Sequence, residues 1–276
     1  MTPGFVEIRD GVHVLRYPLL DVNVTLVVGD GAALLVDTLS SPDQARELIA
    51  AARRVTPHPW TIVNTHHHFD HCFGNAVVAG EPPCPIVAHE ETARLLRQDV
   101  EAVRREAYEE TLPIEPQLAA ELAGVAVLAP TRTVKQRATL EVGGRRVELA
   151  HLGRGHTAGD LVVHVPDADV LVAGDLVEEG AAPSFRGSYP LEWPDTVAAL
   201  LRLAGPDTAI VPGHGAVVDE EFVSAQHAEL VTLDWLIRDG HADRAPAERV
   251  AARAPFGIDA SLPAVRCGYA ELSGRT

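Results

Sequence analysis

Two hydrophobic periods alternate along this chain, and they predict strands and helices in turn. Short apolar, β-branched runs bounded by turn residues are typical of strands, whereas apolar positions three or four residues apart are typical of helices. Strands are predicted at residues 12–17, 22–28, 32–37, 60–64, 85–88, 138–142, 146–149, 161–165, 170–173 and 208–211. Helices are predicted at residues 44–54, 195–203 and 219–238, with two more within 90–124 that are broken at Pro113 and Pro116.

The order of these elements indicates the fold class. Strands, a helix, further strands and further helices predict an α/β sandwich in which helices lie outside two sheets. No linker, repeat or low-complexity segment interrupts the pattern, so we expect a single domain over residues 1–276, with a helical insertion at 90–124 near the active site. The tail at 245–276 is predicted to be helical at first and irregular after Pro255.

The composition is that of a globular protein with an acidic surface. The net charge is −16, apolar residues make up 46% of the chain, and Lys135 is its single lysine. Such a surface repels phosphate backbones, so we expect a small-molecule substrate and neither a nucleic acid nor a membrane partner. No secretory signal or membrane-spanning run is visible, and three cysteines without CxxC spacing indicate no disulfide framework. We therefore expect a cytoplasmic protein, with a homodimer as the candidate assembly.

Histidines cluster at the end of one predicted strand. The segment Thr65-His66-His67-His68-Phe69-Asp70-His71 contains the pattern HxHxDH. Neutral imidazoles and carboxylates are ligands that zinc prefers. On an extended segment His66 and His68 point the same way and can share one ion, whereas Asp70 and His71, past the bend, can face a second ion. His67 lies between the ligands and is expected to point away.

Three further segments combine a candidate ligand with small residues at the end of a strand. Gly155-His156-Thr157-Ala158-Gly159-Asp160 offers His156, Ala173-Gly174-Asp175 offers a carboxylate able to bridge two ions, and Pro212-Gly213-His214-Gly215 offers a last histidine. Together with HxHxDH, and in this order, the motifs between residues 12 and 218 resemble those of the metallo-β-lactamase superfamily.

The resemblance implies an αββα sandwich of two mixed β-sheets flanked by helices, with the metals at one edge between the sheets. It assigns His66, His68 and His156 to a first metal and Asp70, His71 and His214 to a second, with Asp175 as the bridge. The implied cofactors are two Zn²⁺ ions, with Mn²⁺ or Fe²⁺ as alternatives. The implied nucleophile is a hydroxide between the ions. Asp175, which holds the metals, and Asp70, which could relay a proton, are the candidate catalytic residues.

Within this superfamily the chain resembles the branches with a bridging aspartate. β-Lactamases usually carry cysteine or serine at the position of Asp175, whereas the glyoxalase II, lactonase and phosphodiesterase branches carry aspartate. The lysine that some β-lactamases use for the drug carboxylate is missing, since Lys135 precedes the His156 motif. We therefore expect a zinc-dependent metallohydrolase that cleaves a small ester, thioester, lactone or amide, with β-lactamase and phosphodiesterase activity less favoured.

One alternative function belongs to the same fold. An iron-dependent sulfur dioxygenase, similar to persulfide dioxygenases, would use only His66, His156 and Asp175 on a single iron. The presence of Asp70, His71 and His214 favours the two-metal hydrolase over this alternative.

Segments that overhang the metal ligands are expected to select the substrate. Besides the insertion, the segment after the bridging aspartate contains Phe185, Arg186, Tyr189 and Trp193. Aromatic and arginine side chains at these positions would suit a substrate with apolar bulk and one anionic group. Two further aspartates, Asp37 and Asp160, are candidates for orienting ligand imidazoles, with turn capping as the alternative.

Overall fold

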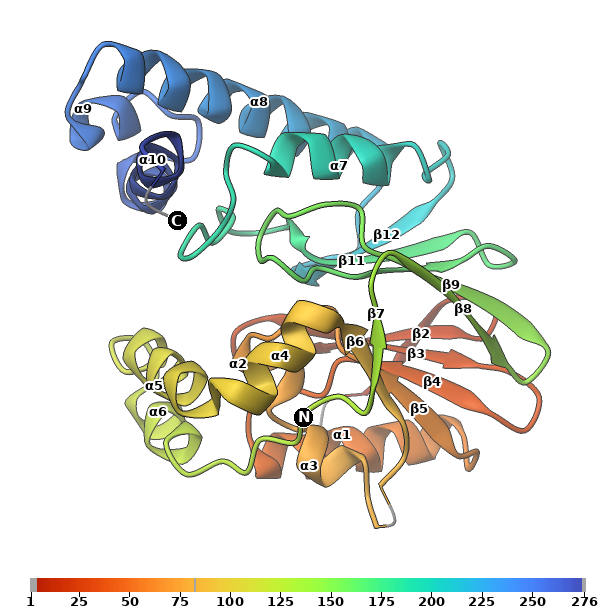
Figure 1. Cartoon of the computed structure of the whole chain (residues 1–276). Coiled ribbons are helices and arrows are strands. Elements are labelled where there is room, and N and C mark those ends of the chain that lie inside the picture. Colours follow the sequence, from red (N-terminus) through yellow and green to blue (C-terminus); the bar gives the residue numbers. More distant parts are fainter. Residues whose placement is uncertain (1–3, 82, 275–276) are drawn as a thin grey trace.

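Two β-sheets face each other, and helices cover both outer surfaces (Figure 1). The computed structural model describes residues 4–81 and 83–274. Its layers follow the order helix, sheet, sheet, helix, which confirms the predicted αββα sandwich. No helix in these two ranges is long and apolar enough to cross a membrane.

The strands form two groups that meet at one edge. The first group runs β7-β6-β5-β4-β3, with β2 and β1 beyond β3, and the second runs β12-β11-β10-β9-β8. They join where His214 of β12 pairs with Val22 of β3. The described strands are β1 (Val6–Arg9), β2 (Val12–Tyr17), β3 (Val22–Val28), β4 (Ala33–Val36), β5 (Trp60–Val63), β6 (Ile86–His89), β7 (Arg132–Val134), β8 (Arg137–Val142), β9 (Arg145–Ala150), β10 (Val162–Val165), β11 (Val170–Glu178) and β12 (Ala209–His214).

The helices form three groups around the sheets (Figure 1). The first sheet is covered by α1 (Pro42–Val55) and α3 (Asn75–Val78). The second sheet is covered by α7 (Trp193–Leu201), α8 (Glu220–Ala242), α9 (Ala247–Ala251) and α10 (Ile258–Leu272). A third group lies at one end of the sandwich and contains α2 (Phe69–Cys72), α4 (Glu90–Gln98), α5 (Val100–Thr111) and α6 (Pro116–Leu122).

Side chains that alternate along the strands build one inner core and two outer cores. On β4, Leu34 and Val36 belong to the core between the sheets, whereas Leu35 packs with the residues of α1 and α3. On β10, Val163 points inward and Val162 packs with α7 and α8. Because successive residues of a strand face opposite sides, strands covered on both faces are apolar throughout. This burial fixes the strand ends from which the site is built.

The insertion and the C-terminal tail differ from the sequence prediction. Residues 90–124 contain three helices rather than two, because Asp99 leaves the helical conformation between α4 and α5. The tail is not irregular after Pro255, since α10 forms there and includes Pro263. Gly268 of α10 lies so close to α8 that an added Cβ would be 2.6 Å from Ile237. Close packing of this helix outweighs the hydrogen bond that the internal proline removes.

Candidate metal centre

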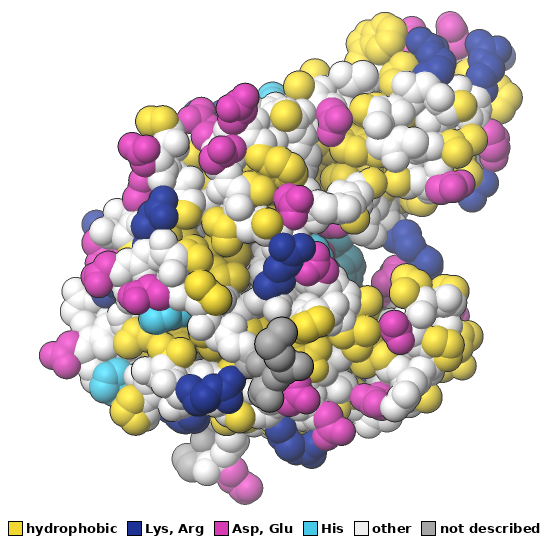
Figure 2. Space-filling model, turned by 180° about the vertical axis from the view of Figure 1, so that it is seen from behind, with side chains coloured by type: hydrophobic (Ala, Val, Ile, Leu, Met, Phe, Trp, Pro, Cys, Tyr) yellow, Lys and Arg dark blue, Asp and Glu magenta, His cyan; other side chains and the backbone are white. Residues whose placement is uncertain are grey.

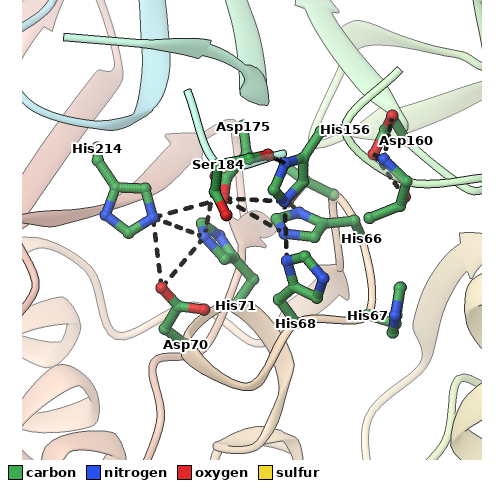
Figure 3. Close-up of polar contacts among 12 residues, drawn as sticks. His66, His67, His68, Asp70, His71, His156, Asp160, Asp175, Ser184 and His214 are labelled. Atoms are coloured by element: carbon green, nitrogen blue, oxygen red, sulfur yellow. Dashed lines mark hydrogen bonds and ion pairs between the residues drawn. The ribbon is translucent and has the colours of Figure 1, made fainter. Parts of the chain in front are cut away.

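Strand ends and short loops bring the seven predicted ligands together (Figure 3). The centre lies at the edge where the two groups of strands meet, and each candidate ligand lies on a buried strand or on the loop or short helix that follows one, which limits its freedom to move. His66 follows β5, His68 caps α2, Asp70 and His71 lie on α2, His156 lies in the loop between β9 and β10, Asp175 lies inside β11, and His214 ends β12.

Asp175 lies between two groups of ligands. Its Oδ2 atom is 3.5 Å from Nε2 of His66 and 3.3 Å from Nε2 of His156, whereas its Oδ1 atom is 3.1 Å from Nε2 of His71. Within each group all ligand atoms lie within 4.8 Å of one another; the groups are His66, His68, His156 and Asp175, and Asp70, His71 and His214. The two groups are those that the family resemblance implied.

Outer hydrogen bonds determine which ring nitrogen of each histidine faces the centre. Nδ1 of His156 lies 3.1 Å from the carbonyl oxygen of Ser184, and Nδ1 of His214 lies 2.7 Å from that of Leu20. A carbonyl oxygen can only accept, so both Nδ1 atoms carry the ring proton. The Nε2 atoms of His156 and His214 therefore face the centre and are the atoms that would bind a metal.

Asp37 orients two more imidazoles, one directly and one through a threonine. Its Oδ2 atom accepts from Nδ1 of His71 at 2.9 Å and from the Thr65 hydroxyl at 2.8 Å. Because that hydroxyl donates to Asp37, it accepts from Nδ1 of His66, which lies 3.0 Å away. His66 and His71 therefore also direct their Nε2 atoms inward, the atoms that would bind a metal.

Asp160 has a different role, because its carboxylate accepts from the backbone and hydroxyl of Thr157. The carboxylate shapes the loop that carries His156 and contacts no imidazole ring among the described residues, whereas the backbone carbonyl of Asp160 accepts from Nδ1 of His151 at 2.9 Å. His67 points away from the ligands, as predicted (Figure 3). Asp37 thus fulfils the orienting role that we predicted, and Asp160 fulfils the alternative of capping a turn.

Nitrogen and oxygen ligand atoms crowd together at the centre. Nε2 of His66 and Oδ1 of Asp175 are buried and lack a hydrogen-bond partner among the described residues. Nε2 of His71 and Nε2 of His214 are 3.4 Å apart, and Nε2 of His156 is 2.8 Å from Nδ1 of His68. Buried lone pairs in this arrangement are costly unless a proton or a cation lies between them. The nitrogen and oxygen ligands therefore fit two metal ions, one in each group.

The two groups differ in their affinity for protons. Burial lowers the pKa of His66 and of His68 well below the usual range. Burial also opposes the charged form of His71 and His214, but the carboxylates of Asp175 and Asp70 raise both pKa values well above the usual range. A metal in the second group must therefore displace protons, whereas the histidines of the first group are already neutral.

The ligands form the floor of a cavity of about 650 Å³. Figure 2 shows histidine at the bottom of a hollow that opens between two lobes of the molecule. Leu20, Phe69, Pro113 and Ile114 contribute apolar parts of the wall. The volume lies within the usual range for small-molecule sites.

Of the four side chains predicted to contact substrate, Arg186 lines this cavity. Phe185 and Trp193 are 1% and 0% exposed and belong to the core under α7 and α8, so they support the site from behind. The Trp193 ring meets the His156 ring edge-on, with 5.6 Å between centroids. The ring of Tyr189 lies under the guanidinium of Arg154, and Tyr189 does not line the cavity. Aromatic residues near a site are often core residues, because their large apolar surface favours burial.

Sequence reasoning missed several groups that complete the site. The carbonyl oxygens of Leu20 and Ser184 fix two ligand histidines, but backbone groups leave no side-chain signal in a sequence. Glu110 of α5 lines the cavity and pairs with Arg186, with 2.9 Å between Oε1 and Nε. Only the packing of the insertion beside the metal ligands brings this carboxylate to the cavity.

Comparisons with known proteins agree with this geometry. The family model described as the metallo-beta-lactamase superfamily matches residues 17–214. A hydroxyacylglutathione hydrolase of Brucella anthropi is 29% identical over 196 residues, which cover 70% of this chain and 61% of that protein. The acyl-coenzyme A thioesterase MBLAC2 of Gallus gallus is 31% identical over 168 residues, which cover 58% of each chain.

Solved structures show the same fold. A metallo-beta-lactamase from Pontibacter korlensis has a TM-score of 0.67 at 22% identity, and the match covers 83% of this chain and 99% of that one. The matches to curated relatives are shorter: across the first four, the aligned part spans 37% to 61% of the relative's length.

Proposed function

This chain belongs to the metallo-beta-lactamase superfamily, and from this premise we propose that it hydrolyses a small carboxylic ester, thioester, lactone or amide with two zinc ions. Membership makes the chain a hydrolase of this superfamily with a metal-binding cluster of histidine and aspartate. The position of Asp175 between two ligand groups is the observation that carries the proposal. A single metal would leave Asp70, His71 and His214 without a metal ion among them.

Each part of the site contributes to the proposed reaction. Two cations held there would lower the pKa of a shared water and polarise the scissile carbonyl. Asp175 fixes the spacing of the two groups, and Asp70, which also lines the cavity, can exchange a proton with a group above the centre. Leu20 and Phe69 add apolar surface to the wall beside the ligands.

Asp175 favours esters and thioesters over β-lactams, because the resemblance associates cysteine or serine at this position with β-lactamases. The single lysine, Lys135, is 79% exposed, pairs with Glu90 and does not line the cavity, so a substrate carboxylate there has no lysine partner. Two relatives support this choice, a hydroxyacylglutathione hydrolase and an acyl-coenzyme A thioesterase, whose matches cover 70% and 58% of this chain. Matches to two metallo-beta-lactamases of type 2 from Bacillus cover 39% and 35% of it. We extend their chemistry to this chain only as the class of bond that is cleaved.

A substrate panel tests the proposal. The zinc-loaded protein should hydrolyse at least one carboxylic ester, thioester, lactone or amide, and His66→Ala should reduce that rate at least 100-fold, roughly the effect of removing one essential catalytic group. Phosphodiesters and β-lactams serve as the comparison substrates. Hydrolysis restricted to either comparison class would contradict the proposal. Oxygen uptake with about one iron per chain would instead support the dioxygenase alternative.

A further inference from the structure

An ion pair spans the cavity above the metal centre. Arg186 lies in the loop between β11 and α7, and Glu110 lies near the end of α5, so the pair joins the insertion to the opposite wall. Both side chains line the same cavity as the metal ligands. The pair therefore lies in the space that a substrate must occupy.

The guanidinium of Arg186 is held by one atom and has further donors to offer. Its Nε atom contacts Oε1 of Glu110 at 2.9 Å, and its side chain is 55% exposed. Neither of its two terminal nitrogens donates a hydrogen bond to a described residue. A guanidinium has five N–H donors in a planar fork that matches a carboxylate. Glu110 thus leaves four donors of Arg186 free while it limits the rotation of the group.

One arginine side chain is available to a substrate anion in this cavity. Arg186 is the single arginine or lysine among the residues that line it. The carboxylates of Asp21, Glu178 and Glu179, which also line it, engage Arg16, the Ser184 amide and the Ala216 amide, respectively. A substrate anion that does not bind a metal is therefore attracted to Arg186.

We propose that Arg186 binds a carboxylate of the substrate, so that this hydrolase selects esters or thioesters that carry an anionic group away from the scissile bond. The proposal rests on the proposed hydrolase function and specifies its substrate class. The apolar residues Leu20, Phe69, Pro113 and Ile114 would accommodate the methylene groups between the two ends. Glu110 acts as a positioning residue that keeps the guanidinium directed over the cavity.

Matched substrates and two variants test this specificity. One pair consists of glutaryl and pentanoyl thioesters of the same thiol, and a second pair carries the carboxylate on the thiol instead. Wild-type protein should prefer the carboxylate-bearing member of one pair by about 10- to 100-fold in kcat/KM, as expected for charge-assisted hydrogen bonds. Arg186→Gln should abolish that preference and leave the rate for the uncharged member within about threefold.

Glu110→Gln distinguishes a substrate-binding role of Arg186 from a purely structural role of the ion pair, in which the pair acts only as a brace between the two segments. Glutamine keeps an oxygen that can accept from Nε of Arg186, so this variant should retain the preference. Arg266→Gln removes an exposed arginine that pairs with Glu248 on the far side of the C-terminal helices, and it should match the wild type. Equal losses for both members of a pair in Arg186→Gln and Glu110→Gln would show a brace and overturn the proposal, as would a wild type without preference.

A binding measurement keeps this test independent of turnover. Calorimetry with the zinc-loaded protein should show that glutarate binds at least 10-fold more tightly than pentanoate, and that Arg186→Gln removes the difference. Equal affinities of the wild type for the two acids would overturn the proposal. If no ester, thioester, lactone or amide is hydrolysed but glutarate is still preferred, the proposed hydrolase function fails while the carboxylate site stands.

Discussion

Asp37→Asn is the most informative change outside the ligand set, because it preserves shape and alters only proton positions and charge. Asp37 is 2% exposed, accepts the Thr65 amide on Oδ1 at 2.8 Å, and accepts His71 and the Thr65 hydroxyl on Oδ2. An asparagine must place its NH₂ group at one of these two positions. If the NH₂ group faces the Thr65 amide, two buried donors oppose each other, which lowers the stability of the fold by about 1 to 3 kcal/mol. Facing His71, it forces the ring proton onto Nε2, which then cannot bind a metal.

Either orientation should weaken metal binding in the second ligand group. Loss of a carboxylate behind a ligand imidazole typically lowers metal affinity 10- to 100-fold, or by about 1.4 to 2.7 kcal/mol. Thr65→Val provides the complementary change, because it interrupts the connection to His66 but leaves the contact between Asp37 and His71. It should weaken mainly the first group, by about fivefold, the value of one neutral hydrogen bond.

Competition titrations against a chelating indicator can resolve the two zinc affinities in each variant. Asp43→Asn is a suitable control, since Asp43 is 83% exposed on α1 and far from the site. The reasoning predicts that Asp37→Asn lowers the affinity of the second site and Thr65→Val that of the first. Two unchanged affinities in Asp37→Asn, within about twofold, would refute the orienting role of this carboxylate.

Three further changes test the bridge, its neighbour and the ion pair. Asp175→Asn should release at least one metal and lower kcat at least 100-fold, about 2.7 kcal/mol, as followed by metal analysis and initial rates. Gly213→Ala would place a Cβ 1.7 Å from Oδ1 of Asp175, so it should displace the bridging carboxylate and reduce metal content in the same assay, with circular dichroism to check the fold. Burial raises the pKa of Glu110 to about 7, although the charge of Arg186 lowers it. The ordinary pKa of this group, which applies to the unfolded chain, is 4.5, so the folded protein loses stability as the pH rises from about 4.5 to 7. Glu110→Gln should therefore stabilise the metal-free protein by about 1 to 2 kcal/mol at pH 8 and by little at pH 4, as measured by urea denaturation.

The sequence predicted the fold and the ligand set because both depend on local patterns. The apolar blocks at Val12–Tyr17 and Val22–Val28 are the observed strands β2 and β3 to the residue. Most of the candidate ligands follow buried strands, and a strand covered on both faces limits the direction in which the next residues leave it. Asp175 differs, because its strand was predicted to end at residue 173 but β11 continues to Glu178. Motif order was therefore sufficient to predict the two groups of side chains that the structure brings together.

Tertiary contacts decided the features that the sequence did not predict. Helix α10 contains Pro263, and its formation depends on close packing against Ile237 of α8, which is distant in the sequence. Trp193 and Phe185 were expected beside the substrate, but nothing local distinguishes an aromatic residue of a core from one of a cavity wall. The ion pair of Glu110 with Arg186 likewise arises only when the insertion packs beside the metal ligands.

Metal content measured together with the hydrolysis rate tests the two-metal centre most directly. Zinc would be counted by mass spectrometry in wild type, His66→Ala and His214→Ala after equilibrium dialysis, and the rate measured before and after chelation. We predict about two zinc ions per chain in the wild type, with an activity that chelation abolishes and zinc restores. His66→Ala should lose the ion of the first group, and His214→Ala mainly that of the second. A wild type that is fully active without metal, or variants that keep both ions, would contradict the account.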